Sequence, residues 1–423
     1  MAYSDVMKRD LHLIRNLGAL LVSAALASCS LVEGPWMGRS KPEAPPAPTV
    51  PALPPPVPTH HFVLEPGQDI VGVVQVTVST KEDTLSDIAR RFNIGYEEIV
   101  RANPGVDPWL PGEGKTIVVP TRYILPNVKR EGIVINMPQM RLFYFPAAKK
   151  GEPQVVYTHP VGIGRVGWVT PQGTTKVVRR QKDPTWRPTA SIIKEHAENG
   201  DPIERVVGPG PDNPLGRHAM YLGWPSYLIH GTNKPAGVGL RSSHGCIRLY
   251  PEDIALLFDN VTVGTKVTVV NEPFTFGWEG DDLYIQAFDV LEDDPRDWKK
   301  AEKKLLTRSL GTSIQKELKK RGLEVSWEQV SKFAHEPRGL PVSITRADSS
   351  IEGLLAAAPT VQNRVPDGAS WDGTTDLPVD EETFQEMLSD RDPQAPVVGG
   401  EKPATPAPTK APAVPVAPNK TGT

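Results

Sequence analysis

The sequence predicts a mostly β domain, a sandwich or a barrel-like fold, together with a small α+β module and Pro-rich segments near both ends. Short runs of β-branched and aromatic residues, separated by Gly and Pro, fill residues 132–270. A strand–helix–helix–strand pattern occupies residues 71–121. Pro accounts for 45 of the 423 residues, and much of it lies in two tracts that are unsuited to a packed core. The folded part is therefore expected to be shorter than the chain.

Residues 1–29 have the features of an export signal. Basic residues precede Leu17–Ala27, an apolar run of 11 residues that is shorter than the roughly 20 needed to span a bilayer. The run ends in Leu26-Ala27-Ser28-Cys29, which resembles the lipobox of bacterial lipoproteins. The resemblance implies a lipid on Cys29, and Ser30 after it implies transfer to the outer membrane, facing the periplasm. An ordinary cleaved signal with an incidental Cys remains the alternative.

Two Pro-rich segments flank the predicted folded part. Residues 30–70 are predicted to be a linker, because nine prolines lie within residues 42–58 and favour extended polyproline geometry. At ~3.1 Å per residue, such a spacer reaches on the order of 100 Å. Residues 347–423 lose aromatic and β-branched residues and end in a Pro/Ala-rich stretch, so we expect a disordered tail.

The module at residues 71–121 begins with a strand at 73–79 and ends with one at 116–119. Thr84 is suited to cap the first helix, and a second helix starts near Tyr96 and stops at Asn103-Pro104-Gly105. The pattern resembles a LysM module, which implies binding to the N-acetylglucosamine-containing glycan of peptidoglycan. Glu82 departs from the Gly that is frequent at this turn in the family. The alternative is a packing module without a ligand. The residues that match are Asp83-Thr84-Leu85, Ile88-Ala89, Phe92, Ile99, Ala102-Asn103-Pro104, Leu110-Pro111-Gly112 and Ile117-Val118-Val119-Pro120.

The β domain at residues 132–270 is followed by an extension at residues 271–346. The extension is predicted to hold a strand at 283–288 and a Lys-rich helix at 295–321. That helix has two interpretations: a membrane-binding surface, or a solvated helix that covers the neighbouring domain, favoured by its mixed charge. The strands predicted in the β domain lie at 133–137, 141–145, 154–163, 175–180 and 265–270, with a short helix near 252–258.

Charge and cysteine content limit the classes of function. With 47 basic and 50 acidic residues, the net charge of −3 gives no general attraction to nucleic acid, so no nucleic-acid partner is expected. Cys29 and Cys246 are the only cysteines, and one disulfide or two inert thiols are the simplest alternatives. A lipid on Cys29 would leave Cys246 as a free thiol in an oxidising compartment, where a retained thiol is more often chemical than structural.

Three residues that suit thiol chemistry lie within 17 positions of one another: His230, His244 and Cys246. A Cys nucleophile needs a base, a group that orients the base, and donors for the oxyanion. His230 precedes Cys246 by 16 residues, which a loop return can bring together, and we expect a lowered pKa for Cys246. Gly245 permits an unusual turn at the nucleophile. Two alternatives stay open: a buried structural Cys, and a zinc site. The zinc site would use His218, His230, His244 and Cys246, although the spacing is tight and no carboxylate lies within it.

The motif resembles the signature of the YkuD-type L,D-transpeptidases. It reads His230-Gly231-Thr232 and then Ser243-His244-Gly245-Cys246-Ile247-Arg248. The flanking residues also fit the family: Asn213-Pro214-Leu215-Gly216, Ala219-Met220 and Pro251-Glu252-Asp253-Ile254. The resemblance covers about residues 132–270 and, more weakly, 277–291, which resembles the extension of Gram-negative LysM-bearing members.

The resemblance implies a role for each matching residue. Cys246 would be the nucleophile and His230 the general base and acid, oriented by the backbone carbonyl of Gly231. Backbone N–H groups from His244 to Cys246, including Gly245, would form the oxyanion hole. A substrate-binding role is implied for Arg248, and the cleft residues expected around it are Ser243, Arg241 and Tyr227.

The implied reaction is acyl transfer on peptidoglycan stem peptides, with no metal or organic cofactor. Cys246 would attack the carbonyl between diaminopimelate and a terminal D-alanine, and an amine would resolve the thioester. The acceptor is open: a second stem, the Lys of a small outer-membrane lipoprotein, or water in a carboxypeptidase or crosslink hydrolase. Two other classes remain: a non-catalytic wall-binding lipoprotein, and a metal-dependent amidase.

Overall fold

The computed structural model describes residues 53–57 and 59–364. The predicted signal with Cys29, most of the Pro-rich linker, and residues 365–423 lie outside this range. None of the helices in the described ranges combines the length and the apolar character needed to cross a membrane.

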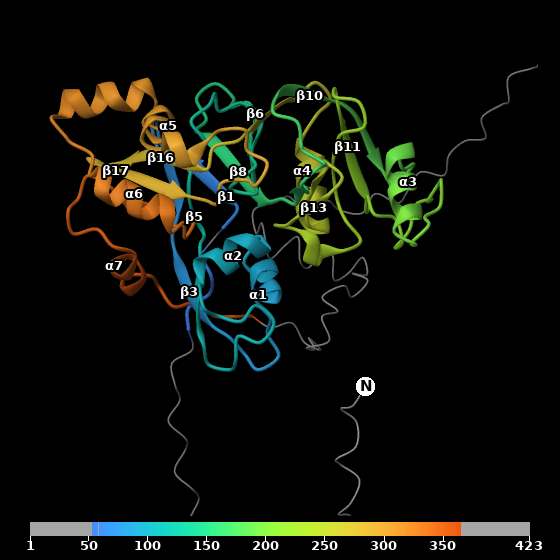
Figure 1. Cartoon of the computed structure of the whole chain (residues 1–423), viewed down its shortest axis with the longest axis horizontal. Coiled ribbons are helices and arrows are strands. Elements are labelled where there is room, and N and C mark those ends of the chain that lie inside the picture. Colours follow the sequence, from blue (N-terminus) through green and yellow to red (C-terminus); the bar gives the residue numbers. More distant parts are fainter. Residues whose placement is uncertain (1–52, 58, 365–423) are drawn as a thin grey trace, which may run out of the picture. The chain divides into compact units, whose positions relative to one another are not determined.

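A nine-stranded mixed sheet forms the centre of the fold (Figure 1). Neighbouring strands are antiparallel except for β6 with β15 and β12 with β14, which are parallel. Ile133 and Ile135 of β6 face one apolar core and Val134 faces another, so β6 is buried on both sides. The mostly β prediction is confirmed. In sheet order, the strands are β1 (His61–Leu64), β8 (Gln154–Pro160), β7 (Arg141–Phe145), β6 (Gly132–Asn136), β15 (Lys266–Val270), β10 (Gly173–Lys182), β11 (His218–Leu222), β12 (Leu228–His230) and β14 (Ile247–Arg248).

Smaller elements complete the β domain. The two-stranded ribbon β9 (Ile163–Gly164) and β13 (Arg241–Ser243) lies beside β14, and a short 3-10 helix, η1 (Pro235–Gly237), precedes β13. Helix α4 (Pro251–Asn260) follows β14 and buries Ile254 and Leu257 in the larger core. Helix α3 (Ala190–Glu198) was not predicted, and it buries none of its side chains.

The α+β module has the predicted order of elements: β3 (Gln75–Val78), α1 (Leu85–Arg91), α2 (Tyr96–Ala102) and β4 (Thr116–Val119). Thr84 caps α1 as expected, since its hydroxyl accepts from the N–H of Asp87 at 3.1 Å. The Asp87 carboxylate accepts in return from the N–H of Thr84 at 2.9 Å. Leu85, Ile88 and Ile99 are fully buried in the small core that these elements enclose.

Two boundaries of the predicted Pro-rich segments are wrong. Strand β1 lies within the expected linker at residues 30–70, but it pairs with β8 along its whole length. Beyond residue 347, helix α7 (Ile351–Ala356) forms, and Val361 is buried in the core of the α+β module. Thr360 also bridges to Val76 of β3. These segments are ordered because they contact parts of the fold that are distant in sequence, such as β8 and the core of the α+β module. Local composition does not reveal such contacts.

Buried ion pairs join the α+β module to the β domain. The guanidinium of Arg141 on β7 contacts both carboxylate oxygens of Glu98 on α2, at 2.8 and 3.0 Å. The two side chains are 0% and 5% exposed. Arg90 of α1 pairs with the fully buried Glu252 of α4 at 3.3 Å. Because a buried charge is costly without its partner, these pairs hold the two parts in one arrangement.

Helix α2 also contacts the loop that follows η1. The backbone N–H groups of Tyr96 and Glu97 donate to the carbonyls of Val238 and Gly239, at 3.3 and 3.1 Å. Gly239 has a φ of +80°, and a Cβ there would collide with the backbone of Gly95 and Tyr96. This close approach requires glycine. The loop in question connects His230 to Cys246 in the sequence.

The C-terminal extension is a separate layer. Its sheet consists of β16 (Phe274–Glu279), β17 (Asp282–Ala287) and β18 (Val342–Ser343), with α5 (Trp298–Arg321) and α6 (Trp327–His335) beside it (Figure 1). The Lys-rich α5, which is kinked at Gly311, buries Leu306, Leu310 and Ile314 against this sheet. It is therefore a covering helix. However, it covers the sheet of the extension, whereas the sequence predicted that it covers the β domain.

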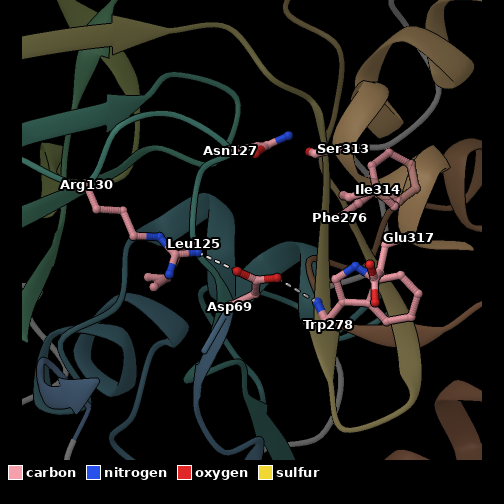
Figure 2. Close-up of a pocket in the computed structure, with 9 residues that line it drawn as sticks. All are labelled: Asp69, Leu125, Asn127, Arg130, Phe276, Trp278, Ser313, Ile314 and Glu317. Atoms are coloured by element: carbon pink, nitrogen blue, oxygen red, sulfur yellow. Dashed lines mark hydrogen bonds and ion pairs between the residues drawn. The ribbon is translucent and has the colours of Figure 1, made fainter. Parts of the chain in front are cut away.

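A cavity of about 310 Å³ lies where the extension meets the chain between the module and the β domain. Figure 2 shows Asp69 at its centre, just before β2 (Ile70–Gly72), which pairs with β5 (Arg122–Ile124). Asp69 accepts from Arg130 at 2.6 Å and from the N–H of Trp278 at 3.0 Å. Both oxygens of its carboxylate are thus engaged by neighbouring segments of the chain.

Candidate active site

Strand pairing brings the two ends of the Cys motif together. His230 ends β12, Cys246 directly precedes β14, and the two strands are parallel with His230 opposite Arg248. Residues 231–246 form the connection that a parallel pair requires. The sequence prediction that a loop return brings His230 near Cys246 agrees with this topology.

The imidazole of His230 is buried and oriented by the backbone. Its Nδ1 lies 2.6 Å from the carbonyl oxygen of Gly231, which can only accept, so Nδ1 carries the proton. The other nitrogen, Nε2, is then the basic one. Burial, together with the nearby Arg248 guanidinium, lowers the pKa of His230 to about 3. The imidazole is therefore neutral at physiological pH, which is the form that can take a proton.

The thiol of Cys246 is half-buried, and its Sγ lies 3.6 Å from the carbonyl oxygen of Ser226. Ser226 has a φ of 68°, an uncommon conformation for a residue with a side chain. Burial raises the pKa of Cys246, although a backbone hydrogen bond from Leu228 and the charge of Arg248 oppose the shift. The expected lowered pKa is wrong, because desolvation outweighs the nearby positive charge. Thiol and imidazole are thus both neutral at rest.

The loop at the nucleophile is held by its own hydroxyl groups. Ser243 donates to the carbonyl of Cys246 at 2.5 Å and accepts from the N–H of Gly245 at 3.1 Å. Thr170 donates to the carbonyl of Gly245 at 3.0 Å. The N–H of Gly245 is thus engaged by Ser243 in this structure, and its role in the oxyanion hole stays a prediction. Ser243 shapes the nucleophile loop.

Glycine is required at position 245 itself. Gly245 has a φ of +98°, and a Cβ there would lie 2.8 Å from Cε1 of Tyr227. The Tyr227 ring therefore packs directly against the nucleophile loop, so the structure brings this predicted cleft residue to the site.

The two predicted arginines have different environments. The backbone of Arg248 pairs in both directions with Gly162, at 2.9 and 3.0 Å, and its Nε is buried without a partner among the described residues. Arg241 is engaged instead: its guanidinium donates to Asp293 at 2.7 Å and to the carbonyl of Gly164 at 3.2 Å. Arg241 therefore holds β9 to the segment between β17 and α5 of the extension, and its substrate-binding role stays a prediction.

The sequence did not predict the partners of His244. Its Nε2 lies 3.0 Å from Oε2 of Glu195 and 3.1 Å from Nη2 of Arg165. The edge of Trp168 packs on its ring, with centroids 4.8 Å apart. No spacing signal marks these residues, because Glu195 is 49 positions away on the unpredicted helix α3.

The zinc alternative finds no ligand set in the part of the chain that the structure describes, where no three His, Cys, Asp or Glu side chains are grouped to hold a metal. His218, one of its four candidate ligands, packs instead on the ring of Phe258, with centroids 4.9 Å apart. Burial is the main cause that lowers the pKa of His218 to about 4.

Acid is expected to destabilise the protein through His230. The unfolded chain binds a proton at this residue below about pH 6.5, whereas the native pKa is about 3. The stability contributed by neutral His230 is therefore complete above pH 6.5 and is lost as the pH falls toward 3. The loss is up to ~1.4 kcal/mol per pH unit. Urea unfolding at pH 7.5 and 5.5 should show a smaller pH dependence for His230→Gln than for the wild type, since His218 and His244 remain in both. Equal pH dependence would contradict the assigned burial.

Comparison with known proteins identifies the domains. The model of the L,D-transpeptidase catalytic domain matches residues 130–269, and that of the LysM domain matches residues 80–120. A probable L,D-transpeptidase, ErfK/SrfK of Salmonella typhimurium, is 39% identical over 286 residues, or 66% of this chain and 89% of the relative. The probable L,D-transpeptidase YbiS of Escherichia coli is 44% identical over 229 residues, or 53% of this chain and 73% of the relative. An L,D-transpeptidase structure from Mycobacterium smegmatis aligns with 33% of this chain and 58% of its own, at 22% identity and a TM-score of 0.24. The chain therefore belongs to the L,D-transpeptidase family, with a LysM domain ahead of its catalytic domain.

Proposed function

We propose that this L,D-transpeptidase acts through a thioester on Cys246 and uses His230 as its base. The observation that carries the proposal is the hydrogen bond between Nδ1 of His230 and the carbonyl of Gly231, beside the strand that begins after Cys246. It leaves Nε2 of His230 to take the thiol proton as sulfur attacks. Burial raises the pKa of Cys246 and lowers that of His230, so the thiol still carries the proton that His230 has to take.

The donor is a tetrapeptide stem that ends in D-alanine. Sulfur of Cys246 adds to the carbonyl between diaminopimelate and D-alanine, and the resulting oxyanion accepts from the backbone N–H of Cys246. The C–N bond then breaks, and His230 returns its proton to the amine of the leaving D-alanine. An acceptor amine attacks the thioester, its proton passes to His230, and the thiol re-forms. Arg248 adds positive charge next to this centre, as its effect on the pKa of Cys246 indicates.

The main acceptor in this proposal is the side-chain amine of a second diaminopimelate, which yields a crosslink. A Lys of a small outer-membrane lipoprotein would use the same chemistry, and water would yield a carboxypeptidase or crosslink hydrolase. Mass spectrometry of muropeptides after incubation with the purified protein distinguishes them. Dimers joined through two diaminopimelates support the proposal, whereas tripeptides alone would establish hydrolysis.

The LysM domain supports binding to peptidoglycan, and we propose N-acetylglucosamine-containing glycan as its ligand. Trp109 follows α2 in this domain and is 60% exposed, and its ring lies 6.3 Å from that of Tyr96. An exposed Trp offers a flat apolar face that a sugar ring can cover, and such anchors dominate many interfaces.

Trp109→Ala is expected to weaken co-sedimentation of the full chain with purified peptidoglycan roughly tenfold. The Cys246→Ala background prevents covalent capture. Val263→Ala is the matched control, because Val263 is 59% exposed on the catalytic domain. Binding should tolerate moderate salt, since ion pairs do not dominate it. Equal binding by both variants would place the glycan elsewhere.

We also propose that the protein is anchored in the outer membrane through a lipid on Cys29, with the Pro-rich linker spanning to the wall. Two or three acyl chains anchor a protein stably, whereas one does not. Cys29→Ser is expected to move the protein from the membrane fraction to the soluble periplasm, without loss of activity in vitro. Wild-type protein found in the soluble fraction would refute the anchor.

A further inference from the structure

A charged cluster beside the nucleophile has no part in the reaction described above. The Arg165 guanidinium forms an ion pair with Oε1 of Glu195. The second oxygen of Glu195 lies 3.0 Å from Nε2 of His244. Nη2 of Arg165 is also 3.1 Å from that same ring nitrogen. One carboxylate thus bridges a guanidinium and an imidazole that belongs to the Cys motif.

The positive side of this cluster is fixed to the motif. The backbone N–H of Arg165 donates to the carbonyl of Ser243 at 3.0 Å, three residues before Cys246. Arg165 directly follows β9, which pairs with β13. Burial and then the charges of Arg165 and Arg248 lower the pKa of His244. The cluster borders the nucleophile loop, because His244 lies two residues before Cys246 and directly follows β13.

The negative side is attached more weakly. Glu195 belongs to α3, a helix of nine residues with no buried side chain. The side chains of Arg165 and Glu195 are 38% and 25% exposed, so both can be reached from solvent. Exchanging the Glu195 carboxylate for another would expose no apolar core. A guanidinium prefers a planar carboxylate, and it would keep one after the exchange.

We propose that Arg165 and His244 form the receptor for a carboxylate of the donor stem peptide, and that Glu195 occupies this receptor until the substrate displaces it. The inference rests on the proposed thioester reaction, since the donor stem carries carboxylates next to the scissile amide. The carboxylate is either that of the terminal D-alanine or the free one of diaminopimelate. Glu195 is then an internal competitor that raises the KM for anionic donors.

The test measures D-alanine release from three tetrapeptide donors: the free acid, the D-alanine amide (release of D-alaninamide), and the diaminopimelate amide. Arg165→Gln should raise the KM for the free acid about tenfold with kcat within about twofold, as expected for lost uniform binding. In the wild type, amidation of the recognised carboxylate should produce a similar rise, and Arg165→Gln should add little to it. The donor that shows this non-additivity identifies the carboxylate.

Glu195→Gln should lower the KM for the free acid severalfold, because the competing charge is gone. Glu198→Gln, on the same helix and more exposed, is the control and should leave KM unchanged. Arg165→Lys should restore part of the binding, and thermal midpoints of all variants exclude misfolding. If Arg165→Gln and Glu195→Gln instead lower kcat equally for all three donors, the cluster only orients His244 and the proposal is wrong.

Failure of the carboxylate-receptor proposal can be distinguished from failure of the thioester mechanism. Alkylation of Cys246 by iodoacetamide should stop D-alanine release in wild type and in Arg165→Gln alike. Release that survives alkylation would refute the thioester, whereas the KM differences among the donors would still report on the receptor.

Discussion

Cys246→Ala is expected to lower the turnover of donor stems at least about a thousandfold, because residues 53–57 and 59–364 hold no other thiol that could replace the nucleophile. The fold should persist, since the half-buried side chain loses only its sulfur. Release of D-alanine measures the loss, and intact-protein mass spectrometry should show no acyl adduct in the variant. The thermal midpoint should stay within a few degrees of the wild type, consistent with ~1 kcal/mol or less.

The matched control is Cys29→Ser, which changes the only other cysteine and should keep full activity in vitro. Two results would refute the thiol mechanism: activity that persists in Cys246→Ala, or activity that a chelator abolishes while Cys246 is intact.

The second large effect is on stability. Arg141→Met should cost about 3–5 kcal/mol in the free energy of unfolding, because it leaves the Glu98 carboxylate buried without its partner. Arg141 also contacts the ring of Tyr123, with its guanidinium carbon 4.1 Å from the ring centroid, so some packing is lost as well. Urea unfolding monitored by far-UV circular dichroism measures the change.

Arg321→Met is the control for this variant, because its partner Glu317 is about one-third exposed and such a pair contributes ~0–1 kcal/mol. The double variant Arg141→Met with Glu98→Met should recover much of the stability, since no unpaired charge remains. A loss as small as that of Arg321→Met would show that the pair does not hold the LysM domain to the catalytic domain.

Local patterns predicted the elements that local forces stabilise. The Thr84 cap with Asp87 three residues later marked the start of α1, and the apolar run at residues 133–137 marked the strand β6. The spacing of the Cys motif likewise predicted a loop return from His230 to Cys246, which agrees with the parallel pairing of β12 and β14. These features depend on residues that are close in sequence.

Long-range contacts account for what the sequence did not reveal. Val361 is ordered only because the core of the LysM domain accepts it, and its neighbours resemble a disordered tail. The Glu195–His244 contact depends on where α3 lies, and that helix buries none of its side chains. The raised pKa of Cys246 depends on burial, which no motif encodes.

The contact of α2 with Val238 and Gly239 has a consequence for where on the polymer the enzyme works. A sugar gripped by the LysM domain and a stem peptide at the thiol are separated by a constant length, because a hinge between them would uncover Arg141 and Glu98. This constant length then determines which stem along the glycan strand reaches the thiol, counted from the sugar that the LysM domain binds. Stems at other positions on the same strand would reach the thiol only after the LysM domain releases the glycan and binds it again.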